Sequence, residues 1–272
     1  MKGNVKLQLI EKNYFIRIVG EKVNFHATFN SGQCFRWSEV NNNTYVGVVN
    51  QKPVIIEAHN DFFDLYNVSV DEFKKYFYWY FDFDKDYNEI EHFLSEHDEV
   101  LSEAVSKYSG MRILNQEPFE CIISFIISQN NNIKRIKMLI DRLCQHYGRK
   151  IDFMGNTFYS FPEPEELINI TEDELIKLGF GYRAKYILSA VDNILNKKIK
   201  GIGDKVADCI LLYSFNKYNA FPLDVWTKRV LKEVYNFQTT KQIYNFINSL
   251  GEYAGYAQLF LFHFIRNYKK ED

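Results

Sequence analysis

The first 60 residues alternate between apolar and polar positions in short runs, a period that is typical of β-strands. The runs at 14–19, 35–40, 44–49 and 54–58 are rich in β-branched and aromatic residues. An asparagine triplet and an Asn-Gln-Lys-Pro segment separate the later runs, and such short polar separators favour tight hairpins. The pattern therefore predicts an antiparallel meander in this part of the chain.

From about Ser69 the apolar residues recur at helical spacing instead. Ser69 followed by Glu72 fits a capped helix start, because each side chain can bond the backbone N–H of the other residue. Further helices are predicted at 118–129, 132–146, 171–178, 184–196, 205–213, 225–235 and 251–267. We therefore predict an α+β protein, in which a strand-rich domain with flanking helices (1–105) packs on a mainly helical domain (106–272).

The net charge of the chain limits which binding partners are possible. The 272 residues carry a formal net charge of −2, with 33 basic and 35 acidic side chains. A strongly basic protein is therefore excluded. A nucleic acid would have to be bound through local basic patches or backbone amides.

The cysteines and the apolar runs limit the metal sites and the cellular compartments that are possible. The four cysteines are widely spaced and include no C-x-x-C pair, which excludes a zinc ribbon or an iron–sulfur cluster built from adjacent ligands. The start of the chain has no signal-like apolar region, and no run of 18 apolar residues occurs. We expect a cytoplasmic protein with reduced thiols and no membrane partner.

The segment Lys200-Gly-Ile-Gly-Asp-Lys205 places two glycines around one apolar residue, directly before a predicted helix. Gly201 and Gly203 permit positive φ angles and a close approach of the backbone to a ligand. The following helix offers unpaired N–H groups and the positive end of its dipole. These features can bind a phosphate without net basic charge, although they also serve an ordinary turn.

Lys205 falls in the first turn of that helix, where the dipole disfavours the ammonium form. An uncharged amine can form a Schiff base, whereas the alternative is a solvated lysine. Cys209 follows at i+4 on the same face and is either a site residue or a small core residue. Asp224 begins another helix as an N-cap. If it also faces Lys205, it can accept a proton or stabilise a developing cation.

Six segments resemble, in order, those of the helix-hairpin-helix DNA glycosylases, and most closely those of the 8-oxoguanine DNA glycosylase/AP lyases. The resemblance extends over most of the chain and implies a helix-hairpin-helix motif in the helical domain, with a lesion pocket between the two domains. The segments are SGQCFRW (31–37), EPFECIISFIISQNNNIKRI (117–136), LGFGYRAKYI (178–187), GIGDKVADC (201–209), PLDVW (222–226) and YAGYAQLFLF (253–262).

The resemblance implies a bifunctional enzyme of base excision repair, which excises 8-oxoguanine from double-stranded DNA and then cleaves the strand. Lys205 would attack the sugar C1′ and form a Schiff base that permits β-elimination, and Asp224 would stabilise the sugar cation. The base must first leave the duplex, because its sugar carbon is otherwise shielded. The resemblance implies no required cofactor and leaves open a structural monovalent or divalent cation at the hairpin. We expect a monomer that acts at the nucleoid of a prokaryote or in the nucleus of a eukaryote.

The resemblance also assigns residues to the lesion and to the DNA. Gly32 would aim its carbonyl at N7 of the lesion, which carries a proton that guanine lacks; having no side chain, it can approach closely. Gln258 would bind the Watson–Crick edge, while Phe262 and Cys209 would stack on the two faces of the base. Core packing is the alternative for Phe262. The implied DNA-binding residues are Asn130, Arg135, Tyr182, Arg183, Gly201, Gly203 and Trp226.

Among these, Tyr182 would insert into the base stack, and Arg135 and Arg183 would donate to cytosine as the opposite base. The alternatives are an exposed helix charge for Arg135 and a helix C-cap for Asn130. Trp226 departs from the histidine of some members, which puts a phosphate contact there in doubt. Only six residues separate Ile194 from Gly201, where the family normally has a further helix. Either the helix predicted at 184–196 runs directly into the hairpin, or residues are absent from the sequence at this point, and our hypothesis is the second.

Two rival functions follow from the same motifs. The first is a sister glycosylase for alkylated bases or oxidised pyrimidines. Lys205 argues against the alkylation enzymes, and the scattered cysteines argue against the pyrimidine enzymes that carry a four-cysteine cluster. The second is a non-catalytic DNA-binding module that retains the hairpin, against which the pairing of Lys205 with Asp224 argues.

Overall fold

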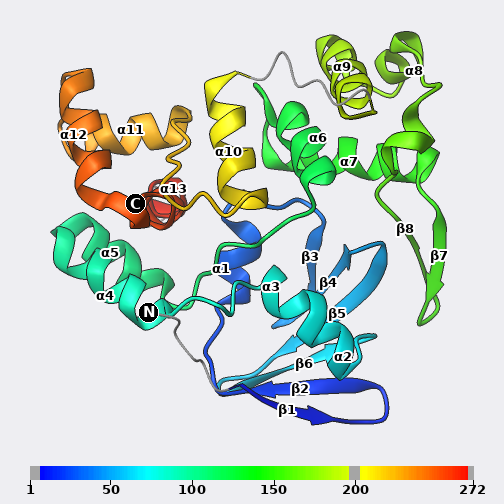
Figure 1. The fold of residues 1–272 in the computed structure, drawn as a ribbon, viewed down its shortest axis with the longest axis horizontal. Coiled ribbons are helices and arrows are strands. Elements are labelled where there is room, and N and C mark those ends of the chain that lie inside the picture. The colour runs from blue at the N-terminus through cyan, green and yellow to red at the C-terminus, as the bar shows by residue number, and fades with distance from the viewer. Residues whose placement is uncertain (1–6, 196–202, 269–272) are drawn as a thin grey trace.

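In the computed structural model, which describes residues 7–195 and 203–268, a β-sheet packs against a larger group of helices (Figure 1). The sheet has six strands in the order β1-β2-β6-β5-β4-β3, and every neighbouring pair is antiparallel. Its strands are β1 (Gln8–Glu11), β2 (Phe15–Val19), β3 (Trp37–Asn41), β4 (Thr44–Val49), β5 (Lys52–Ala58) and β6 (Phe62–Tyr66). The four predicted runs are strands β2, β3, β4 and β5, and β3 to β5 form the predicted meander; β6, which the pattern did not predict, pairs between β5 and β2.

The seven predicted helical segments after residue 117 are helices in the predicted order, the helices Tyr87–His97, Glu99–Tyr108 and Thr240–Leu250 are additional, and the α+β fold class is confirmed. Short helices α1 (Phe25–Asn30), α2 (Val70–Glu72) and α3 (Tyr78–Tyr80) accompany the sheet, and a π-helical turn (Phe73–Phe77) joins the last two. The remaining helices are α4 (Tyr87–His97), α5 (Glu99–Tyr108), α6 (Pro118–Ser128), α7 (Ile133–Tyr147), α8 (Glu172–Lys177), α9 (Ala184–Leu195), α10 (Asp204–Ser214), α11 (Val225–Glu233), α12 (Thr240–Leu250) and α13 (Ala254–Tyr268). A small hairpin of β7 (Lys150–Phe153) and β8 (Asn156–Tyr159) projects beside α7 (Figure 1).

Local sequence chemistry sets several helix starts. Ser69 and Glu72 form the predicted capping box, and Thr171 and Glu174 form another at α8. Asn132 caps α7 by accepting from the N–H of Arg135 at 2.9 Å. Because each cap satisfies an N–H that the helix itself leaves unpaired, these positions define where the helices begin.

Two apolar cores divide the molecule. The sheet packs its inner face on aromatic residues of the α2–α3 region, among them Phe73, Phe77 and Phe81. The second core joins all the longer helices and includes Ile90 of α4 and Leu101 of α5. Helices α4 and α5 therefore pack with the helical part, and the domain boundary at residue 105 stays a prediction.

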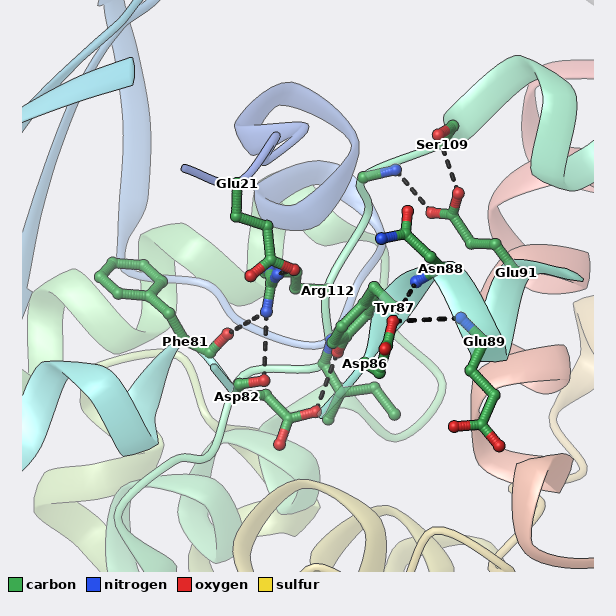
Figure 2. A network of polar contacts seen from close by, with 12 residues as sticks. Glu21, Phe81, Asp82, Asp86, Tyr87, Asn88, Glu89, Glu91, Ser109 and Arg112 are labelled. Atoms are coloured by element: carbon green, nitrogen blue, oxygen red, sulfur yellow. Dashed lines mark hydrogen bonds and ion pairs between the residues drawn. The ribbon is translucent and has the colours of Figure 1, made fainter. Parts of the chain in front are cut away.

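A buried carboxylate lies where the two cores meet (Figure 2). Asp82 is 1% exposed, and its carboxylate accepts hydrogen bonds from Tyr218 (2.7 Å), Tyr87 (2.9 Å) and Tyr256 (3.1 Å). Burial raises the pKa of Asp82 to about 6, and the hydroxyl donors oppose that rise. Arg112, which is fully buried, donates to the backbone carbonyl of the same residue at 3.1 Å. This network joins the segment after α3 to helices α4 and α13.

Gln33 holds the loop after α1 in the same junction. The side chain is fully buried, and its Nε2 donates to the Arg112 carbonyl at 2.7 Å. Its Oε1 accepts from the Leu114 N–H at 2.7 Å, and its own carbonyl accepts from Gln116 at 2.8 Å. Because all three partners lie on the segment before α6, the loop is fixed relative to the helical core.

The first helix of the predicted helix-hairpin-helix motif, Gly201 and the hypothesis of absent residues before it fall on 196–202, outside the described residues. Within the described residues, no helix is both long enough and apolar enough to cross a membrane.

Candidate active site

A cavity of about 210 Å³ opens where the loop after α1 meets helices α6, α7, α10, α11 and α13. Figure 1 shows α10 standing between α6 and the group formed by α11 and α13. Seven residues that the sequence assigned to the site line this one cavity: Gly32, Lys205, Cys209, Asp224, Trp226, Gln258 and Phe262. Residues far apart in the chain are thus brought together, as the resemblance implies.

Lys205 lies in the first turn of α10, which begins after the N-cap Gly203. Its Nζ lies 5.0 Å from the centroid of the Phe125 ring. Cys209, one turn further on, is 3% exposed, and burial raises the pKa of its thiol to about 12. A thiol that stays neutral offers the cavity a small, polarisable surface. Helix α10 therefore presents the amine of Lys205 and the neutral thiol of Cys209 to the same cavity.

Asp224 is the N-cap of α11, as the sequence suggests. Its Oδ1 accepts from the Thr227 N–H at 2.7 Å. The same side chain lines the cavity together with Lys205. Capping and facing the cavity are therefore compatible, because the carboxylate has a second oxygen with free lone pairs.

Helix α13 contributes a row of three residues at four-residue spacing, which places Gln258, Phe262 and Arg266 on one face. Gln258 is 4% exposed, and its Nε2 donates to the Thr227 hydroxyl at 3.0 Å. Its Oε1 is buried and has no hydrogen-bond partner among the described residues. The Arg266 guanidinium lies 5.2 Å from the Phe262 ring centroid and donates to the Asn30 carbonyl at 3.2 Å.

Gly32 follows α1 with a φ of +81°, a region that L side chains rarely adopt. A Cβ at this position would lie 2.8 Å from Cε1 of Phe262. The neighbouring Gln33 fixes the loop to the segment before α6. The backbone of Gly32 is therefore held close to the ring that lines the cavity.

The other predicted DNA-binding residues lie together outside the cavity lining. Asn130 has a φ of +48° just after α6 and donates to the Tyr182 hydroxyl at 3.3 Å. Tyr182 is 47% exposed, whereas Arg183 is 6% exposed and donates from Nε to the Gln129 carbonyl at 3.0 Å. Arg135 reaches the Gly179 carbonyl at 3.5 Å. The arginine contacts hold two loops together, and the DNA contacts of this group stay predictions.

Thr227 and Arg266 are site residues that sequence reasoning missed. Arg266 lies eight residues after Gln258, and that helical spacing was a usable signal. Thr227 lies three residues after Asp224, which is the N3 position of a capped helix. Its contact with Gln258, 31 positions away, had no sequence signal.

One group of potential metal ligands occurs among the described residues, formed by Glu57, His59 and Asp64 at β5 and β6. Both carboxylate oxygens of Asp64 accept from Arg17, at 2.7 and 2.8 Å. The group is explained as an ion pair within the sheet, and none of its members lines the cavity.

Comparison with known families first defines the class. The model described as the HhH-GPD superfamily of base excision DNA repair proteins matches residues 123–252. The model described as the 8-oxoguanine DNA glycosylase N-terminal domain matches residues 15–122. The chain therefore belongs to the 8-oxoguanine DNA glycosylase family within the HhH-GPD superfamily.

Two curated relatives illustrate the similarity. A probable N-glycosylase/DNA lyase of Methanothermobacter thermautotrophicus is 33% identical over 211 residues, which are 62% of this chain and 68% of the relative. The N-glycosylase/DNA lyase OGG1 of Arabidopsis thaliana is 34% identical over 205 residues, or 62% of this chain. That match spans only 55% of the Arabidopsis protein, so the chain corresponds to about half its length.

Solved structures agree over nearly the whole chain. The 8-oxoguanine glycosylase/lyase of Clostridium acetobutylicum, in complex with double-stranded DNA containing cytosine opposite 8-oxoguanine, has a TM-score of 0.91 and 34% identity. That match covers 96% of this chain and 98% of the other. MBOgg1 in complex with a low-affinity DNA ligand has a TM-score of 0.92 and 36% identity, over 97% and 99% of the two chains.

Proposed function

We propose that this protein is a bifunctional DNA glycosylase/AP lyase, which excises 8-oxoguanine from double-stranded DNA in base excision repair. One observation carries the proposal: Lys205 and Asp224 line a single cavity together with Gly32, Gln258 and Phe262. A nucleophilic amine, an acid and a base-sized hollow are the groups that base excision through a Schiff base needs. Because the proposed substrate is genomic DNA, the enzyme acts where that DNA is located in the cell.

The chemistry begins when the damaged nucleotide rotates out of the duplex into the cavity. The Lys205 amine bonds to C1′ as the bond from C1′ to the base breaks, and the electron pair leaves with the base. Asp224 stabilises the positive charge that develops on the sugar and accepts the proton that the amine loses. The sugar ring then opens to give a Schiff base. Loss of a C2′ proton expels the 3′ phosphate and cleaves the strand.

Lesion recognition depends on the N7 proton. In 8-oxoguanine N7 is a donor, whereas in guanine it is an acceptor. The Gly32 carbonyl accepts from the lesion and repels the lone pair of guanine. An unmade hydrogen bond in a desolvated site costs about 1–3 kcal/mol, which gives roughly tenfold or more from this contact. Phe262 and Cys209 contact the two faces of the base, and Gln258 bonds its Watson–Crick edge.

The group around Tyr182 meets the duplex beside the cavity. The exposed tyrosine inserts into the stack from which the base has departed, and Asn130 lies beside it. Arg135 and Arg183 donate to the cytosine opposite the lesion. Gly201 and Gly203 contact phosphates through the backbone, and Trp226, which lines the cavity, binds the DNA through its indole N–H. The protein binds the duplex as a monomer and requires no cofactor, with a cation at the hairpin left open.

Trapping with borohydride tests this function. The protein is incubated with duplexes that carry 8-oxoguanine opposite each of the four bases, because borohydride reduces a Schiff base to a stable covalent adduct. We expect an adduct with wild-type protein and none with Lys205→Gln. Lys74→Gln is the control and should leave the yield unchanged, because Lys74 is an exposed lysine on the π-helical turn and does not line the cavity. An adduct with uracil or methyladenine duplexes but none with 8-oxoguanine would transfer the function to a sister glycosylase. Duplex binding without any adduct would instead support the non-catalytic module.

A further inference from the structure

We propose that Thr227 is a positioning residue for base recognition, because its hydroxyl holds the amide of Gln258 at the cavity. This inference rests on the proposed function and deepens it. Gln258 is expected to contact the base, whereas Thr227 is not among the residues that line the cavity. Thr227 therefore acts through its neighbour.

The contact joins two helices inside the protein. Thr227 is fully buried in the first turn of α11, and Gln258 lies on α13 with 4% exposure. The Gln258 Nε2 donates to the Thr227 Oγ1 at 3.0 Å. A buried amide that is bonded at one end cannot shift away from its partner without losing that bond. The threonine thus fixes where the glutamine amide stands.

The other end of the amide is left open for the base. The Gln258 Oε1 is buried and lacks a partner among the residues that the structure describes. A buried acceptor without a donor is costly, so a ligand that supplies a donor at this point gains affinity. The Watson–Crick edge of a guanine-type base presents donors at N1 and N2, whereas adenine presents an acceptor at N1. Holding the amide with Oε1 toward the base therefore favours guanine-type lesions.

The backbone and side chain of Thr227 serve different partners. The backbone N–H donates to the Asp224 carboxylate at 2.7 Å, while the hydroxyl serves Gln258. A Thr227→Val substitution replaces the hydroxyl by a methyl group of nearly the same size and keeps the backbone N–H. The acid therefore keeps its position, and only the base-dependent step changes.

The experiment compares a substrate that contains the base with one that lacks it. Excision is measured under single-turnover conditions on an 8-oxoguanine·cytosine duplex, and Schiff-base trapping is measured on a duplex with an abasic site. We expect Thr227→Val to lower excision about tenfold, equivalent to one hydrogen bond of about 1.4 kcal/mol, and to leave abasic trapping within about twofold. Thr227→Ser, which restores the hydroxyl, should recover excision to within about threefold of wild type. Thr227→Val should also reduce the preference for 8-oxoguanine over 8-oxoadenine.

Thr28→Val is the matched control. Thr28 is also fully buried, and its hydroxyl accepts from the Arg112 N–H at 3.1 Å, away from the cavity lining. This variant should leave the ratio of excision to abasic trapping unchanged, even where it lowers the melting temperature. Equal loss of excision and trapping in Thr227→Val would overturn the inference, since the effect would then pass through Asp224 or the fold. Unchanged excision would also overturn it, and a wild-type protein inactive on both substrates would overturn the proposed function as well.

Discussion

Substitution of Gly32 by alanine tests whether the loop after α1 discriminates the lesion. The residue has a φ of +81°, where a non-glycine residue is strained by about 1–2 kcal/mol. The added Cβ would also lie 2.8 Å from Cε1 and 3.1 Å from Cζ of the Phe262 ring. The neighbouring loop cannot shift freely, because Gln33 is bonded to three residues of the segment before α6.

The strain is relieved by rotating the Gly32 peptide or by moving the Phe262 ring. Either movement disturbs a group that the proposed function assigns to the base. Loss of the carbonyl contact to the N7 proton is worth about 1–3 kcal/mol. We therefore expect lesion discrimination to fall by about five- to 140-fold, since 1.4 kcal/mol corresponds to a factor of ten.

The assay measures dissociation constants for 8-oxoguanine·cytosine and guanine·cytosine duplexes in a Lys205→Gln background, where no base is released. The ratio of the two constants reports discrimination independently of chemistry. Gly155→Ala is the matched control, because Gly155 has a φ of +75° and nothing within 4 Å of the added Cβ. It should lower stability and leave the ratio unchanged. An unchanged ratio in Gly32→Ala, or an equal fall in Gly155→Ala, would refute the argument.

Two further predictions concern the carboxylates of Asp224, which lines the cavity, and of Asp82, which is buried. Asp224→Asn should slow base release at least about tenfold while duplex affinity stays within about twofold, because asparagine still caps α11; an equal loss of affinity by fluorescence anisotropy would count against a catalytic role. The pKa of Asp82 is raised to about 6 from 3.8, so the stability that this group contributes is present below pH 3.8 and is lost as pH rises through 6. The shift in pKa corresponds to about 3 kcal/mol in the free energy of unfolding. In urea unfolding between pH 4 and 7, Asp82→Asn should lose this part of the pH dependence. An identical pH dependence in the two proteins would contradict the prediction.

The longer helices could be predicted because their signals are local. Pro118 stands at the first position of α6, and Asn132 caps α7, so both starts follow from short-range chemistry. Strand β6 was missed because it does not alternate: Phe63, Asp64 and Leu65 are all buried in succession. Asp64 is tolerated there through its ion pair with Arg17, 47 positions away. Such a pairing is a product of the fold and has no local signal.

In the candidate site, too, some features follow from local spacing and others only from the packing of the fold. Gln258 and Phe262 could be placed on one face of α13 from their spacing alone. That this face meets Lys205 of α10 and Asp224 of α11 depends on how three helices pack, which no spacing reveals. Thr227 is the clearest example, since its cap contact with Asp224 is local whereas its contact with Gln258 joins two helices.

The helix ends also explain how a chain of net charge −2 attracts a polyanion. Residues at the starts of three helices line the cavity: Asn132 at α7, Lys205 at α10 and Asp224 at α11. Each start places the positive end of a helix dipole at the cavity, although Asn132 and Asp224 each already accept one of the first-turn N–H groups. For the proposed function, these dipole ends add a local positive contribution at the cavity, which the Asp224 carboxylate at α11 offsets in part. The proposed binding of DNA therefore depends on local geometry rather than on total charge.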